Sequence, residues 1–136
     1  MEQLGIRAGL VAIGGLALAG ASIIGISDNP PGIGLTYGAI LCLIAAAVWR
    51  WRRPRSFLLL FAFSVVAFGV FVVAHNLFYG IGKSVDEAWI ELLMEGLHVG
   101  AFLIAVLICP AGALVGLVGW IATVIRSWRK PDVPTG

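Results

Sequence analysis

SFLLLFAFSVVAFGVFVVAHNLFYG, residues 56–80, is the stretch that decides the fold. It contains no Asp, Glu, Lys or Arg. A helix of about 20 apolar residues crosses the hydrocarbon core of a bilayer, which is roughly 30 Å thick. The stretch therefore predicts a transmembrane helix, and the rest of the chain is interpreted around it.

The composition of the whole chain agrees with a membrane protein. Of its 136 residues, 60% are hydrophobic and 12% are charged, against about 25% charged in soluble domains. A soluble domain this small exposes too much of its chain to hide so much apolar surface. The length allows one domain, residues 1–136. The net charge of +2 is too small to indicate nucleic-acid binding. Because the chain is so hydrophobic, the expected partners are the bilayer and other membrane subunits.

Three further spans are predicted, at about 4–26, 34–50 and 97–126. The first carries a single charge, Arg7. Asp, Asn, two prolines and a glycine within residues 27–32 predict the first loop, and Pro54 separates the second span from the third. The sequence therefore predicts an all-α, integral membrane four-helix bundle, followed by a polar tail at 127–136.

Residues 84–95 differ from the spans around them. Ser84 and Glu87 fit the capping box, in which a hydroxyl and a carboxylate bind free amides at a helix start. Trp89 lies on an apolar side of this segment, while Glu91 and Glu95 lie on another. We expect a short amphipathic helix on the membrane surface between spans three and four, with Trp89 at the headgroup level. The alternative is that these residues form the outer end of the fourth span.

The charges predict the orientation of the chain. Four alternating spans place eight of the nine basic residues at one end, whereas Lys83 and five of the seven acids are at the other. By the positive-inside rule the basic end is cytoplasmic. This predicts a multi-pass protein of the cytoplasmic (inner) membrane with both termini in the cytoplasm. The eight basic residues are Arg7, Arg50, Arg52, Arg53, Arg55, Arg126, Arg129 and Lys130.

Small residues predict how the spans pack. In lipid, close helix contact depends on small side chains such as the GxxxG pair. Gly5 and Gly9 form one pair and Gly112 and Gly116 another, so we expect spans one and four to pack together at the basic end. Pro110 predicts a kink near residues 106–110, because proline removes one backbone bond and clashes with the preceding turn.

His75 and His98 are the residues on which any chemistry is expected. A stripe along residues 57–75, with Ser64 and His75 on it, indicates an inward face. Both histidines belong to the outer end of the bundle, where they could bind a b-type haem or a quinone head group. The helix rise places His75 about 28 Å from Ser56 but His98 about 42 Å from Arg126, so their depths need not match. Cys42 and Cys109 form no CxxC and are interpreted as apolar residues, and no metal site is predicted.

The predicted function is that of a structural or accessory subunit of a larger membrane complex. No nucleotide loop, nucleophile motif or HExxH is present in the sequence, so a role other than catalysis is favoured. The alternative is a redox-complex subunit that binds haem b or a quinone near His75 and His98. The residues predicted to contact a partner or lipid are Trp89, Glu91, Glu95, Arg50, Arg52, Arg53 and Arg55.

Overall fold

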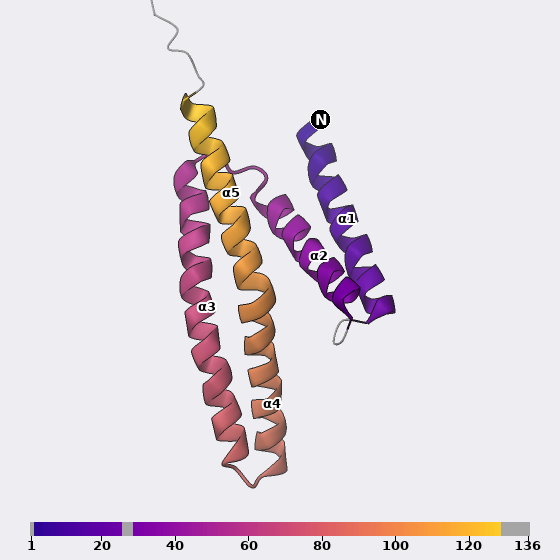
Figure 1. Ribbon diagram of the computed structural model, residues 1–136, viewed down its shortest axis with the longest axis vertical. Coiled ribbons are helices and arrows are strands. Elements are labelled where there is room, and N and C mark those ends of the chain that lie inside the picture. Colours follow the sequence, from indigo (N-terminus) through magenta and orange to yellow (C-terminus); the bar gives the residue numbers. More distant parts are fainter. Residues whose placement is uncertain (1, 26–28, 129–136) are drawn as a thin grey trace, which may run out of the picture.

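The computed structural model describes residues 2–25 and 29–128, and these form helices joined by short connections (Figure 1). The helices are α1 (Glu2–Ile24), α2 (Pro30–Val48), α3 (Pro54–Lys83), α4 (Ala88–Leu103) and α5 (Cys109–Trp128), with the π-helical segment η1 (Ile104–Ile108) between the last two. By length and composition, four helical stretches can cross a membrane. The predicted all-helical, four-span fold is confirmed.

Prolines and a glycine set the helix boundaries. Gly25 has φ of +94°, a conformation open mainly to glycine, and it ends α1. Pro30 and Pro54 are the first residues of α2 and α3, where the missing proline amide costs nothing because helix starts have no partner for it. The predicted tail beyond Trp128 lies outside the described residues.

The chain forms two helical hairpins of unequal length. Helix α1 packs against α2, and α3 packs against α4 and α5. The unbroken helical stretch Ala88–Trp128 has 41 residues, about 62 Å at the usual helix rise. The second hairpin therefore extends well past the end of α1 and the start of α2, as Figure 1 shows. This helix length is about twice the thickness of the hydrocarbon core, which is roughly 30 Å. The α3–α4 end of the second hairpin therefore extends outside the core.

The separate surface helix expected at residues 84–95 is not present, and the alternative is correct. Helix α4 begins at Ala88 and continues into η1 and α5 without a non-helical residue. Gly96 lies within this helix among residues that favour helix, so it does not break it. The capping box is wrong as well, because the Ser84 hydroxyl donates to the Gly80 carbonyl at the end of α3 (2.9 Å). Glu87 is the residue that precedes α4.

Where a kink is predicted from Pro110, near residues 106–110, the structure has the π-helical turn of η1. Proline cannot donate a backbone bond, and its ring crowds the carbonyl four residues earlier. In the structure the amide of Cys109 donates to the carbonyl of Ile104, five residues back. This wider turn, of a kind often found inside α-helices, lets the helix continue on both sides of Pro110.

The expected packing of spans one and four is wrong. Within the described residues α1 packs against α2 alone, whereas the glycines of α5 face α3. A Cβ on Gly112 would meet the Ser64 hydroxyl, and one on Gly116 would meet the backbone of Phe61. A GxxxG pair indicates that another helix can approach closely but not which helix does so. Phe57 and Ser64 are buried at this contact, which confirms the inward stripe of α3 there.

The first hairpin uses small residues in the same way. A Cβ on Gly14 would lie 3.2 Å from the Ala39 carbonyl oxygen, and Ala21 and Ala39 are fully buried. The Arg7 guanidinium donates from Nε to the Ala46 carbonyl (3.1 Å), which ties α1 to the end of α2.

Charge is divided between the two ends of the molecule. The start of α1, the α2–α3 connection and the end of α5 lie at one end (Figure 1), with Arg7, the arginines of 50–55 and Arg126. The α3–α4 connection forms the other end, with Lys83 and the carboxylates of residues 86–95. The predicted division of the described charges is thus confirmed, and Arg129, Lys130 and Asp28 lie outside the described residues.

Candidate functional sites

The structure brings the two histidines into contact. Nδ1 of His75, on α3, lies 2.9 Å from the backbone carbonyl oxygen of His98, on α4. Because a carbonyl can only accept, His75 carries its proton on Nδ1 in this bond. The two rings lie with centroids 5.1 Å apart and planes inclined by 39°. The sequence alone left open whether these residues meet.

Aromatic rings extend this contact along both helices. The Phe102 ring lies 5.4 Å from that of His75, and the Tyr79 ring lies 5.6 Å from that of His98. The Lys83 ammonium lies 5.8 Å from the centroid of Tyr79, within the range of a cation–π contact. His75, His98, Tyr79, Phe102 and Lys83 therefore form one continuous group, which we call the histidine cluster.

A small cavity of about 150 Å³ adjoins the histidine cluster. The predicted Glu91 and Glu95 line it with His98 and Lys83, so acidic and basic groups share its wall. Within residues 2–25 and 29–128, no group of three or more metal-binding side chains is present. The cavity is smaller than the 300–1,000 Å³ of typical small-molecule sites, so it accommodates an ion, water or a small head group.

The histidine geometry argues against a haem held between the two rings. Axial imidazoles of a haem lie on opposite faces of the porphyrin, each with a nitrogen on the iron. Here the two rings touch each other, and Nδ1 of His75 is engaged by the backbone. A porphyrin would have to separate α3 from α4 to enter.

Trp89, predicted to contact a partner or lipid, lies at the start of α4 with 67% of its surface exposed. Its indole Nε1 donates to the carboxylate of Glu87 (3.1 Å). Leu92 and Leu93 are exposed beside it. The tip of the second hairpin thus presents an apolar surface next to carboxylates.

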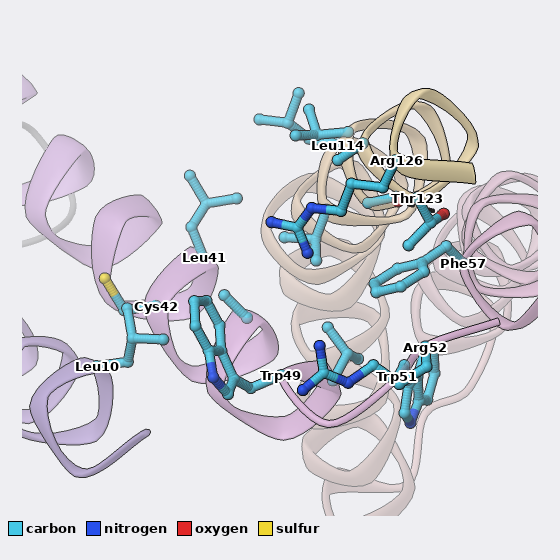
Figure 2. Close-up of a pocket in the computed structure, with 16 residues that line it drawn as sticks. Leu10, Leu41, Cys42, Trp49, Trp51, Arg52, Phe57, Leu114, Thr123 and Arg126 are labelled. Carbon is cyan, nitrogen blue, oxygen red and sulfur yellow. Dashed lines mark hydrogen bonds between the residues drawn. The ribbon is translucent and has the colours of Figure 1, made fainter. Parts of the chain in front are cut away.

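At the basic end, a groove of about 660 Å³ lies between the two hairpins. Figure 2 shows its walls, which come from α2 and α5 with contributions from α1, α3 and the α2–α3 connection. Of the four arginines in residues 50–55, Arg52 lines the groove; Arg50, Arg53 and Arg55 do not. Arg126 joins it from α5. The sequence named the arginines of this connection, but only the fold distinguishes Arg52.

Three pairs of glycines with GxxxG spacing lie open on the surface. A Cβ at any of these six positions would meet nothing within 4 Å. Only the first pair was identified from the sequence, although all three have the same spacing. The pairs are Gly5 and Gly9 on α1, Gly34 and Gly38 on α2, and Gly96 and Gly100 on α4.

Neither cysteine belongs to the histidine cluster. Cys109 is buried and Cys42 is half-buried, and both are free thiols. Cys42 lines the groove, and Cys109 is the first residue of α5.

Comparison of the chain with protein-family models, with curated proteins and with solved structures gives no match.

Proposed function

We propose that this membrane protein is a small accessory subunit of a larger membrane assembly. It binds other transmembrane helices through faces that its own fold leaves open. In this proposal the assembly lies in the cytoplasmic membrane, with both termini of this chain in the cytoplasm.

The observation that carries the proposal is the contrast between filled and open glycine pairs. Side-chain and backbone atoms of α3 occupy the space that a Cβ on Gly112 or Gly116 would need, so we call this pair filled. Gly5 and Gly9 have the same spacing on α1, and nothing occupies that space. Small-residue pairs let helix backbones approach closely. The close packing at a glycine pair that joins α5 to α3 is therefore also possible between α1 and a helix from another protein.

The position of α1 supports this role. Within the described residues it packs against α2 alone, so its remaining surface is free to contact a neighbour. Leu16 lies seven residues after Gly9, on the same helix face by the 3.6-residue period, and 74% of its surface is exposed. The open face therefore continues over more than three turns.

Native mass measurement after extraction in mild detergent tests the proposal. Wild-type protein is expected in a species larger than the monomer, and Gly5→Leu with Gly9→Leu should release the monomer. Gly15→Leu is the matched control, since Gly15 also meets nothing within 4 Å but lies on another face of α1. A monomeric wild-type protein in the mild-detergent extract, or equal release by the control, would contradict the proposal.

A redox-complex subunit is the second candidate, favoured by the contact between His75 and His98. Imidazoles next to carboxylates can move a proton near neutral pH, and Glu91 and Glu95 share a cavity with His98. The small volume of that cavity favours a quinone head group or a proton path over a haem.

A further inference from the structure

The groove between the hairpins differs from the open helix faces in being hollow, with walls from several elements. Its volume of about 660 Å³ lies within the 300–1,000 Å³ typical of sites for small molecules. Residues of α2 and α5 line its two long sides, and the α2–α3 connection closes one end (Figure 2).

Apolar side chains line the body of the groove. Leu41 and Ala45 project from α2, and Leu114 and Val118 from α5. All four belong to predicted membrane spans, where the surrounding solvent is hydrocarbon. A hydrocarbon chain fits such walls, because it needs no hydrogen-bond partner.

Two arginines and a tryptophan form the mouth of the groove. The guanidinium groups of Arg52 and Arg126 point into the space between Trp49 and Phe57 (Figure 2). One guanidinium group can donate two hydrogen bonds to the oxygens of a phosphate. Tryptophan rings favour the headgroup level of a bilayer. Basic pockets between transmembrane helices recognise anionic lipid head groups.

We propose that the groove binds one anionic membrane phospholipid. Its phosphate lies between Arg52 and Arg126, and one acyl chain lies along Leu41, Ala45, Leu114 and Val118. Charge complementarity selects this occupant, because the carboxylates of residues 86–95 lie at the opposite end of the molecule. A transmembrane helix from a partner or a second copy would instead place apolar side chains against two guanidinium groups.

Titration of the purified, delipidated protein with phosphatidylglycerol or phosphatidylcholine of identical acyl chains tests the proposal. Native mass spectrometry counts the bound lipid. We expect one tight site for phosphatidylglycerol, with about tenfold weaker binding of phosphatidylcholine. Arg52→Gln with Arg126→Gln should weaken phosphatidylglycerol binding by about the same factor. Arg53→Gln with Arg55→Gln is the matched control, since it removes equal charge outside the groove and should leave this site intact.

Two further measurements examine the groove itself. Val118→Trp should block lipid binding, because Val118 lines the groove and 56% of its surface is exposed, so the larger ring does not enter the protein core. Bound phosphatidylglycerol should also slow alkylation of Cys42 by N-ethylmaleimide, with Cys109 replaced by Ala. Equal binding of both lipids, equal loss in the control pair, or unprotected Cys42 would overturn the proposal. So would a delipidated protein that is a stable dimer with the groove covered.

Discussion

The backbone of Phe61 passes so close to Gly116 that a Cβ at position 116 would lie 2.6 Å from the Phe61 amide nitrogen. Helices α3 and α5 are thus in contact through backbone at this point, deep in the second hairpin. No side chain larger than hydrogen fits at position 116 unless α3 and α5 move apart.

Enlarging this glycine should destabilise the isolated protein. Gly116→Ala is expected to lower the free energy of unfolding by about 1–3 kcal/mol, the usual cost of forcing extra atoms into a packed contact. Gly112→Leu should act in the same direction, since its Cβ would meet Ser64. Thermal unfolding in detergent measures both. Gly5→Leu with Gly9→Leu is the control, and a similar loss there would contradict the distinction between filled and open pairs.

The bond between the two histidine positions predicts an asymmetric response to mutation. His75→Phe removes the donor of the bond to the His98 carbonyl and should cost about 0.5–1.5 kcal/mol. His98→Phe keeps that bond, because the acceptor is backbone, and it retains an aromatic ring beside Tyr79. Thermal unfolding of the two variants should therefore rank His75→Phe below His98→Phe. The reverse order would show that the His98 ring matters more than the bond.

The contact between the rings predicts the absorption spectrum of the purified protein. We expect no Soret band, because a porphyrin cannot enter between rings whose centroids lie 5.1 Å apart. The measurement is an absorption scan of protein extracted in mild detergent from cells supplied with haem. A Soret band that disappears in His75→Ala would establish the redox alternative instead.

The division of charge predicts how the chain lies in the membrane. In a variant with Cys42 and Cys109 replaced by Ala, Ser84→Cys should react with a membrane-impermeant thiol reagent added to intact cells. Arg53→Cys should react only after the membrane is opened, because the positive-inside rule places the α2–α3 connection in the cytoplasm. The opposite labelling pattern would invert the orientation.

The sequence predicted the elements of the fold well because each depends on local properties. Hydropathy located four spans, and Pro54 marked the start of α3. Pro30 was placed in the first loop, whereas it is the first residue of α2, because proline suits a helix start as well as a loop. The boundary near Ser84 failed for a local reason too. A hydroxyl can bind either the turn before it or the helix after it, and Ser84 binds the turn before it, at Gly80.

The relative placement of helices could not be predicted, because spacing along one helix does not identify its neighbour. The depths of the two histidines show this. The helix rise puts His98 about 42 Å from Arg126 and His75 about 28 Å from Ser56, which left their relative depth open, but α5 continues past the start of α3. Phe57 lies level with Gly119, as the ring of Phe57 fills the space of a Cβ there. From that level both histidines are about 30 Å away by the helix rise, so they meet.

The groove at the basic end was also beyond sequence reasoning. Its walls come from both hairpins, so Arg52 and Arg126 gain their common role only when α2 and α5 are placed side by side. Four arginines in residues 50–55 look equivalent in the sequence. The turn of the chain before Pro54 directs one of them to the groove.

The most direct test of the accessory role is photo-cross-linking in intact membranes from a probe at Leu16, on the open face of α1. A probe at Phe63 of α3, whose side chain is 70% exposed, serves as the control for random contact with membrane proteins. The proposal predicts one discrete protein adduct from Leu16, which disappears in Gly5→Leu with Gly9→Leu and persists in Gly15→Leu. An adduct pattern from Leu16 no different from that at Phe63, or limited to lipid, would contradict it.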